Sequence, residues 1–238
     1  MAQHVVITGA SRGIGRAIAL ELAGKGYRLT LLSRQSRTEL EQLQQEIKQK
    51  DSVSCDIFLC DVGNYRQVQQ TFARIDTVDI LINNAGMAHI GLLSDMEEEQ
   101  WHRMISTNLD ALFYTSKQVI PDMVRRKSGQ IINISSVWGN VGASMEVAYS
   151  ATKGGANSFT RALAKELAPS HIRVNAVAFG AIDTQMNACL TAEDRELLIQ
   201  EIPADRLGTT QEAAKMVLQV MEAPEYLTGQ VITMDGAW

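Results

Sequence analysis

A glycine-rich segment with the spacing of a phosphate-binding turn follows the first predicted strand. It reads Thr8-Gly9-Ala10-Ser11-Arg12-Gly13-Ile14-Gly15, and a helical pattern begins at Ile14. Gly9 permits a tight turn, Gly13 lets the backbone approach a pyrophosphate, and Gly15 lets the helix pack closely on the strand. The helix N-terminus adds N–H groups without partners, which attract an anion. The spacing is G-x-x-x-G-x-G and not G-x-G-x-x-G, but its place directly after a first strand predicts nucleotide binding.

The second predicted strand ends in a base, where an acid commonly holds the ribose hydroxyls of NAD. Its last residues are Leu31-Leu32-Ser33-Arg34. An acid there would repel a 2′-phosphate, whereas Arg34 and Arg12 can pair with it through charge-assisted hydrogen bonds. The sequence therefore predicts NADP(H) as the cofactor. The alternative is that Arg34 is a solvated surface arginine.

Two short segments follow the third and fourth predicted strands. They are Asp61-Val62 and Asn83-Asn84-Ala85-Gly86. Ligands of parallel sheets bind beyond the carboxyl ends of the strands, so these segments lie where the adenine and the central sheet edge are expected. By itself, the Asn-Asn-Ala-Gly segment would indicate only a loop.

A tyrosine and a lysine further along the chain are spaced so that they can act together. Tyr149 and Lys153 are four residues apart in a helical pattern, so both side chains lie on one face of that helix. Ser136 follows the fifth predicted strand, and Asn108 lies on the long helix before it. An exposed tyrosine and a surface lysine on an ordinary helix would explain the pair alone. The four positions together indicate an active site.

Strands and helices that alternate along the chain would position these residues. Short apolar runs alternate with longer stretches at helical spacing, which predicts a doubly wound parallel sheet with helices on both faces. The predicted strands are 4–8, 28–32, 54–59, 79–83, 130–134, 173–178 and 231–234. The predicted helices are 14–23, 37–50, 65–75, 97–126, 149–167 and 211–221. No linker divides the chain, so we expect one α/β domain of the Rossmann type over residues 1–238.

Composition and charge narrow the class of protein. The 238 residues carry 22 basic and 27 acidic side chains, and this net charge of −5 argues against binding to nucleic acid or to a membrane surface. No apolar run reaches the ~20 residues that cross a bilayer, and no signal peptide precedes Val5, so we expect a soluble cytoplasmic protein. Cys55, Cys60 and Cys189 fit neither a disulfide framework nor a metal site. We therefore expect reduced thiols and no bound metal.

In combination, these motifs resemble the short-chain dehydrogenase/reductase family. The resemblance covers the whole chain, from the glycine-rich turn to Gly229 and Asp235-Gly236. It implies that a ketone accepts hydride from NADP(H) while Tyr149 protonates its oxygen. Lys153 would bind the nicotinamide ribose and lower the pKa of the phenol, which is ordinarily about 10.

The resemblance assigns the remaining roles as well. Ser136 would orient the carbonyl oxygen, and Asn108 would support a water molecule of a proton relay. Contacts with the cofactor are implied for Gly9, Ser11, Arg12, Gly13, Ile14, Gly15, Ser33, Arg34, Asp61, Val62, Asn84, Ala85, Gly86, Tyr149, Lys153, Gly180, Ile182 and Thr184. One position departs from the family, because the loop after the sixth strand begins Phe179-Gly180 and not Pro-Gly. The rigidity that the fixed φ of proline gives this segment is then not assured.

The motifs leave three functions open. The closest general resemblance is to bacterial 3-oxoacyl-(acyl-carrier-protein) reductases of fatty acid biosynthesis, which reduce a β-keto thioester with NADPH. A narrower similarity is to aminopentanone reductases, which act on a modified lysine of elongation factor P. It runs through Ser135-Ser136-Val137-Trp138-Gly139, Gly142-Ala143-Ser144-Met145-Glu146-Val147 and Ala164-Lys165-Glu166-Leu167-Ala168-Pro169. The third function is a non-catalytic NADP-sensing regulator, but such regulators usually lose the Tyr/Lys pair.

Charges near the expected pocket bear on the partner. An acidic acyl carrier protein needs basic residues at the mouth of the active site. Lys127, with Arg125 and Arg126, fills one of two expected positions, and the other falls in Pro169-Ser170-His171, which offers no fixed cation. Glu146 lies on the loop that should line the substrate entrance, where a carboxylate would favour an amine. Its alternative is a solvated loop glutamate.

The family resemblance also bears on assembly. Relatives are commonly tetramers built on a pair of long helices and the last strand. Apolar Phe159, Leu163 and the predicted strand 231–234 are compatible with such contacts. We therefore expect a homotetramer or a homodimer.

Overall fold

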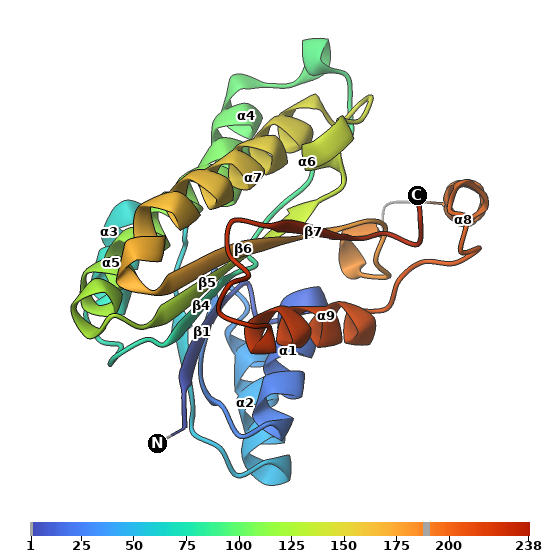
Figure 1. Ribbon diagram of the computed structural model, residues 1–238. Helices are drawn as coiled ribbons and strands as arrows, with labels where there is room; N and C mark the ends of the chain where they lie inside the picture. Colours follow the sequence, from blue (N-terminus) through green and yellow to red (C-terminus); the bar gives the residue numbers. More distant parts are fainter. Residues whose placement is uncertain (1, 188–190) are drawn as a thin grey trace.

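The computed structural model, which describes residues 2–187 and 191–238, contains one parallel sheet (Figure 1). Its strands are β1 (His4–Thr8), β2 (Arg28–Ser33), β3 (Cys55–Leu59), β4 (Ile80–Asn83), β5 (Gly129–Ser136), β6 (Ile172–Phe179) and β7 (Val231–Met234). Their order is β3-β2-β1-β4-β5-β6-β7. The chain thus winds outward from β1, returns to place β4 beside β1, and winds outward the other way. Doubly wound sheets bind ligands at this change of direction, and the predicted fold class is confirmed.

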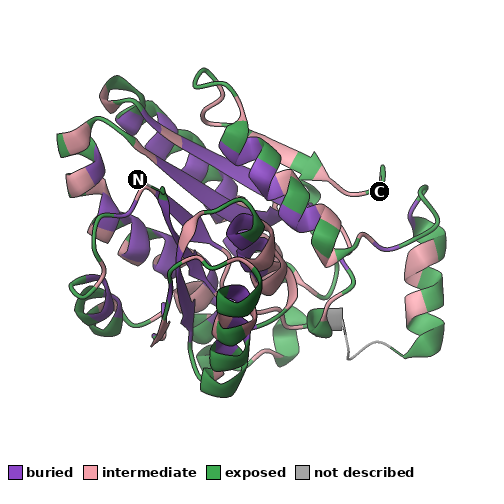
Figure 2. Cartoon of the chain, turned by 90° about the horizontal axis from the view of Figure 1, so that it is seen from below, coloured by how far each residue is buried: buried purple, intermediate pink, exposed green. Residues whose placement is uncertain are grey.

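Helices cover both faces of the sheet (Figure 1). One layer contains α1 (Gly13–Gly24), α2 (Arg37–Lys50) and α9 (Thr210–Glu222), and the other contains α3 (Tyr65–Phe72), α5 (Ala111–Arg126) and α7 (Val147–Leu167). Successive residues of β1 pack against opposite helix layers, because Val5 and Ile7 belong to one apolar cluster and Val6 belongs to the other. Figure 2 shows the resulting buried sheet between partly exposed helices. Within the described residues, no helix has the length and apolar character needed to span a membrane.

The long helix predicted over 97–126 is interrupted. The structure has α4 (Glu98–Ile105), a π-helical turn over Ser106–Asp110, and then α5. A π turn adds a residue to the helical repeat without changing the apolar pattern much, so periodicity alone does not reveal it. Such turns are frequent at functional sites. Here the turn carries Asn108.

Two short helices beyond the carboxyl ends of the strands differ from the sequence-based expectation. The four residues of α6 (Trp138–Val141) are too few to show a helical period. Helix α8 (Ala192–Glu201) has no buried residue, so it lacks the apolar stripe that would predict it. Its start is fixed by Thr191, whose Oγ1 accepts a hydrogen bond from the backbone N–H of Asp194 at 3.1 Å. Cys189, expected to be a reduced thiol, lies outside the described residues.

Strand pairing holds the segment that lacks the family's proline. Phe179 is the last residue of β6 and pairs with Ser136 of β5 and with Met234 of β7. Its ring is buried in the apolar core, and its carbonyl accepts a hydrogen bond from Val137 N at 3.0 Å. Gly180 N–H then donates to Met234 O at 3.0 Å. Pairing on both sides therefore constrains this segment in place of a proline ring.

Candidate active site

The glycine-rich turn leaves no space for side chains. Gly9 has a φ of +65°, and a Cβ on it would lie 2.8 Å from Ala85 Cα. A Cβ on Gly15 would lie 2.4 Å from Gly9 O. The chain therefore requires glycine at both positions, and α1 can begin close against the end of β1. This fits a turn that lets a dinucleotide phosphate reach the backbone N–H groups at the start of a helix.

The turn is fastened to the end of β4. Asn84 Nδ2 donates to the carbonyl oxygens of Thr8 and Gly9, each at 3.0 Å. Thr8 Oγ1 accepts from the backbone N–H groups of Asn84 and Ala85, also at 3.0 Å. The Asn-Asn-Ala-Gly segment thus braces the turn from the neighbouring strand, in addition to any contact with a ligand.

The two arginines near the predicted adenosine end are exposed. Neither Arg12 nor Arg34 has a side-chain hydrogen bond or ion pair with the part of the chain that the structure describes. Between them lie two buried serines, Ser11 and Ser33, whose hydroxyl oxygens are 3.3 Å apart. Both cations are therefore available to an anion beside the carboxyl end of β2.

Asp61 and Val62 follow β3 at the other side of this surface. Asp61 Oδ1 accepts from Gly63 N at 3.0 Å, and Asp61 N–H donates to Gln67 Oε1 at 2.9 Å. Val62 is buried. These contacts hold a partly exposed carboxylate at the edge of the sheet, where it can accept a hydrogen bond from an adenine amino group.

Asn108 is buried and fully engaged with the protein. Its Oδ1 accepts from Met87 N at 2.9 Å, and its Nδ2 donates to Met87 O at 2.8 Å and to Thr152 Oγ1 at 3.1 Å. Thr152 Oγ1 in turn donates to Tyr149 O at 2.7 Å. The π turn thus couples the segment after β4 to the helix that carries Tyr149.

Lys153 reaches the core of the site from one turn below Tyr149. Its side chain is buried, and Nζ donates to Ile134 O at 2.8 Å. Burial disfavours the ammonium form and lowers the pKa of Lys153 to about 8. The Lys153 Nζ atom lies 5.6 Å from the centroid of the Tyr149 ring, over its face.

Tyr149 differs from the sequence-based expectation in its acidity. Burial raises the pKa of Tyr149 to about 12, a hydrogen bond with Ser136 opposes this rise, and the charge of Glu146 adds to it. The prediction that Lys153 lowers this pKa is wrong for this structure. The physical reason is that Nζ lies over the ring and donates to Ile134 O, so desolvation dominates at the hydroxyl.

Hydrogen bonds link Ser136, Trp138 and Glu146 beside Tyr149. Trp138 N–H donates to Ser136 Oγ at 3.2 Å, and its indole Nε1–H donates to Glu146 Oε1 at 3.1 Å. The Trp138 ring packs edge-on against Trp238, with centroids 4.6 Å apart. Partial burial raises the pKa of Glu146, and the Trp138 hydrogen bond opposes this. Glu146 is therefore a positioned group, and the alternative of a freely solvated glutamate is wrong.

The loop after β6 returns to the glycine-rich turn. A Cβ on Gly180 would lie 2.8 Å from Asp235 Cα, and one on Gly13 would lie 3.6 Å from Thr184 Cγ2. Ile182 is buried and forms an isolated parallel bridge with Gly208. Thr184 therefore lies near Gly13, so the loop after β6 comes close to the glycine-rich turn.

The basic residues expected at the mouth, Lys127 with Arg125 and Arg126, lie just before β5. Lys127 lies two residues before β5, whereas Ser136 ends it, and the seven steps between Gly129 and Ser136 separate the two ends of this strand by about 23 Å. Arg126 is engaged with Asp79, at 2.9 Å, and Arg125 with Asp122. Residues before a parallel strand lie at the opposite sheet edge from residues after it, so within one chain these three cations lie away from Tyr149.

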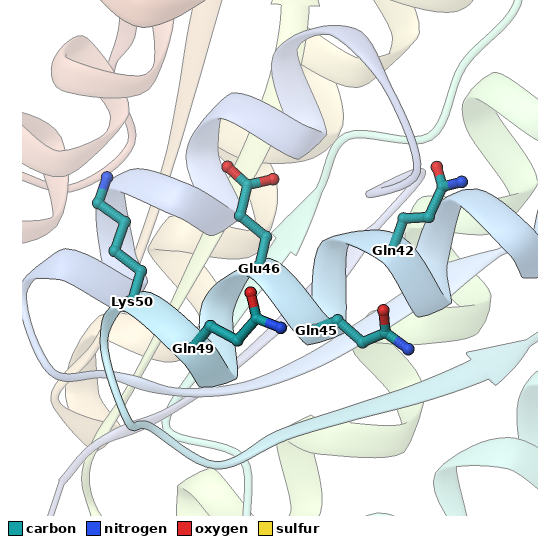
Figure 3. Close-up of a pocket in the computed structure, with 5 residues that line it drawn as sticks. All are labelled: Gln42, Gln45, Glu46, Gln49 and Lys50. Atoms are coloured by element: carbon teal, nitrogen blue, oxygen red, sulfur yellow. The ribbon is translucent and has the colours of Figure 1, made fainter.

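A polar hollow on the outer surface of α2 lies apart from these residues. Figure 3 shows its lining, Gln42, Gln45, Glu46, Gln49 and Lys50. No residue predicted for the site lines it. Among the residues that the structure describes, no group of three or more His, Cys, Asp or Glu side chains is arranged to hold a metal ion.

Three positions near the site escaped the sequence reasoning. Thr8 braces the turn, Thr152 joins Asn108 to α7, and Trp138 joins Ser136 to Glu146. Thr152 lies between Tyr149 and Lys153, and Trp138 lies two residues after Ser136. Their closeness in sequence to predicted site residues is the signal that could have identified both as site residues.

Comparisons with known proteins agree over the whole chain. A family model described as short chain dehydrogenase matches residues 3–195. An uncharacterized oxidoreductase of Bacillus subtilis is 37% identical over 240 residues, covering 100% of this chain and 99% of that protein. A 3-oxoacyl-[acyl-carrier-protein] reductase of Staphylococcus aureus is 38% identical, with 99% and 98% covered. The crystal structure of a 3-oxoacyl-[acyl-carrier protein] reductase from Brucella melitensis is similar with a TM-score of 0.92 and 31% identity, covering 99% of this chain and 90% of that one.

Proposed function

The chain belongs to the short chain dehydrogenase family, and from this membership we propose that it is an NADPH-dependent ketone reductase whose substrate is a 3-oxoacyl thioester on acyl carrier protein. The observation that carries the proposal is the meeting of four groups beyond β5. Tyr149 lies close enough to Ser136 for the serine to influence its pKa, Lys153 Nζ lies over its ring, and Asn108 is joined to its helix through Thr152. Bound NADPH would supply the hydride.

The side chains have distinct tasks in this reaction. The Tyr149 hydroxyl donates its proton to the carbonyl oxygen as that oxygen gains negative charge. Ser136 donates a hydrogen bond to the same oxygen and orients it. With a pKa of about 12, Tyr149 is protonated at neutral pH but is a weaker acid than a free phenol. Lys153 compensates the phenolate that this transfer leaves, and it offers Nζ–H donors to a ribose.

The exposed arginines support NADPH as the partner. Arg12 and Arg34 flank the buried serine pair at the end of β2, without side-chain partners among the described residues. A 2′-phosphate would accept charge-assisted hydrogen bonds from both guanidinium groups.

An apolar rim supports an acyl substrate. Two loops meet beside Tyr149 through a hydrogen bond from Gly91 N–H to Met145 O at 2.8 Å. They expose large apolar side chains, namely Ile90, Leu92, Leu93, Val141, Met145 and Val147. Such a rim favours an acyl chain over a strongly polar substrate. The named activity of the Staphylococcus aureus relative is consistent with this substrate class.

The test compares the turnover of NADPH on two ketones by the purified protein. We expect oxidation of NADPH with an acetoacetyl thioester, and slower or no oxidation with a basic aminoketone. The reverse preference would favour the second candidate below. Binding of NADPH without turnover of either ketone would instead favour a non-catalytic NADP sensor.

Glu146 favours a second candidate, reduction of the aminopentanone modification on elongation factor P. Its carboxylate lies beside Tyr149 and accepts a hydrogen bond from the Trp138 indole through one of its two oxygens. A carboxylate next to an indole ring attracts an ammonium group. This local chemistry fits a substrate that carries an amine better than it fits a neutral thioester.

Neutralising this carboxylate separates the two candidates. Glu146→Gln keeps an acceptor for the Trp138 indole but removes the charge. We expect KM for a basic aminoketone to rise severalfold, because the ion pair is lost, and KM for a thioester to stay unchanged. Exposed Glu99 on α4 provides the matched control, Glu99→Gln. If Glu146→Gln changes KM for both ketones equally, the carboxylate does not recognise the cation of the aminoketone.

A further inference from the structure

A buried amide lies directly behind the reacting groups. Asn157 is on α7, one turn after Lys153, and its side chain is 1% exposed. Its Oδ1 accepts a hydrogen bond from Ser135 Oγ at 2.6 Å, and its Nδ2 donates to Asn140 Oδ1 at 2.9 Å. One side chain therefore joins three elements, the end of β5, the helix α6, and α7.

The contact between α6 and α7 is close at the same place. A Cβ on Gly139 would lie 2.6 Å from the carbonyl carbon of Lys153 and 2.9 Å from Asn157 Nδ2. Helix α6 therefore rests on the α7 backbone at the turn that carries Lys153. With only four residues, α6 has little stability of its own. Its position depends on these contacts.

The groups that α6 and β5 present to the site depend on this arrangement. Ser135 is the direct neighbour of Ser136, and Asn140 is two residues after Trp138. Trp138 donates to Ser136 Oγ and to Glu146. Tyr149 stands on α7 and Ser136 ends β5, so the position of one relative to the other needs α7 and the end of β5 in a fixed relation.

We propose that Asn157 is a positioning residue, which holds α6 and the end of β5 against α7 and thereby sets Ser136 opposite Tyr149. The proposal rests on the proposed reductase function, because Ser136 and Tyr149 are its reacting groups. The hydrogen bonds of the Asn157 side chain go to Ser135 and Asn140 and to neither of these two groups. A displacement of about 1 Å in a reacting group can reduce a rate by roughly a hundred-fold.

The first measurement compares two buried asparagines. Asn157→Leu removes the amide at similar size, and Asn175→Leu is the matched control. Asn175 is equally buried and makes two hydrogen bonds, to Leu227 O and from Gln230 N, on the β6 to β7 connection. Both variants should lower the melting temperature. We expect only Asn157→Leu to lower kcat, by roughly ten- to a hundred-fold, with a smaller change in KM.

A second measurement does not depend on turnover. Labelling with 5-fluorotryptophan gives a ¹⁹F resonance for each of the three tryptophans, Trp101, Trp138 and Trp238. We expect the Trp138 resonance to shift or broaden in Asn157→Leu, because α6 loses its anchor, and to stay in place in Asn175→Leu. If the unmutated protein reduces no ketone, the proposed function fails, while this comparison still decides whether Asn157 holds α6.

A third variant covers the case in which Asn157→Leu does not fold. Asn140→Ala removes the other end of the same hydrogen bond from a partly exposed position. It should lower kcat and move the Trp138 resonance in the same direction. In the double variant, the loss in kcat should be no larger than in Asn157→Leu alone, because both changes break one bond. Additive losses, or an unchanged kcat and Trp138 resonance in either single variant, would overturn the proposal.

Discussion

The two ends of the candidate site differ in how firmly the protein holds its own side chains. At the carbonyl end, Asn108, Ser136 and Lys153 are buried and bonded to neighbouring strands and helices. At the phosphate end, Arg12 and Arg34 are exposed and lack side-chain partners in the described residues. Folding therefore fixes the first set, whereas a ligand would have to order the second.

This difference predicts different consequences of mutation. Groups that are already ordered lose little entropy when a ligand arrives, so they can hold a transition state without further cost. Exposed arginines must lose rotamer freedom on binding, and salt screens them. We therefore expect changes at the carbonyl end to act mainly on turnover and stability. Changes at the phosphate end should act mainly on cofactor affinity.

Among the basic residues at the two ends, the largest effect is expected at Lys153. Lys153→Met removes the buried cation and the donor to a ribose, so turnover should fall at least about a hundred-fold and NADPH affinity should fall as well. Steady-state kinetics and a cofactor titration measure both. Lys165→Met, at an exposed position on the same helix, is the control. Turnover equal to that of the control would remove the lysine from the mechanism.

Arg34 should give the next largest effect. Arg34→Asp replaces a partner of the 2′-phosphate with a repelling charge, so we expect Kd for NADPH to rise by roughly ten- to a hundred-fold. Kd for NADH and the melting temperature should hardly change, because the Arg34 side chain has no partner among the residues that the structure describes. The exposed Arg66, on α3, provides a control, Arg66→Asp. An equal weakening of NADH would mean that Arg34 does not select the phosphate.

The smallest effect concerns stability, again at Lys153. The pKa falls from 10.5 to about 8 on folding, so below pH 8 both states are charged and the folded state bears the full cost of desolvation, on the order of 3 kcal/mol. The hydrogen bond to Ile134 O offsets part of it. Without cofactor, Lys153→Met should therefore be more stable than the parent by about 1 kcal/mol near pH 7. Denaturant unfolding measures this difference.

The pH dependence of that difference has a definite sign. As pH rises from 8 through 10.5, the unfolded state binds more protons than the folded state, so the parent gains stability relative to the variant. The advantage of Lys153→Met should shrink over this window. An advantage that grows with pH would contradict a desolvated ammonium group.

Sequence reasoning predicted the frame of the molecule well, because strands buried on both faces have an unmistakable pattern. The seven predicted strands all occur, with ends displaced by up to two residues. The π turn at Asn108 was not predictable, since one extra residue hardly changes an apolar period. Helix α8 was not predictable either, since it buries nothing.

At the site, residue types were predictable from motifs, but electrostatics were not. The spacing of Tyr149 and Lys153 predicts a shared helix face, and the structure has them there. The direction of the Tyr149 pKa shift depends on burial and on where Nζ points, which spacing does not encode. Lys127 and Ser136 lie at opposite ends of β5, and this separation follows from the direction of the strand and not from the types of the two residues.

The most direct test of the account is the single-turnover rate of Tyr149→Phe with saturating NADPH and an acetoacetyl thioester. The ring stays, so the variant should fold and bind NADPH with nearly the parent Kd. The proton donor is lost, so we predict a rate about 10²–10⁴-fold below that of the parent. A rate equal to the parent's, at full cofactor occupancy, would show that another group protonates the product and would contradict the account.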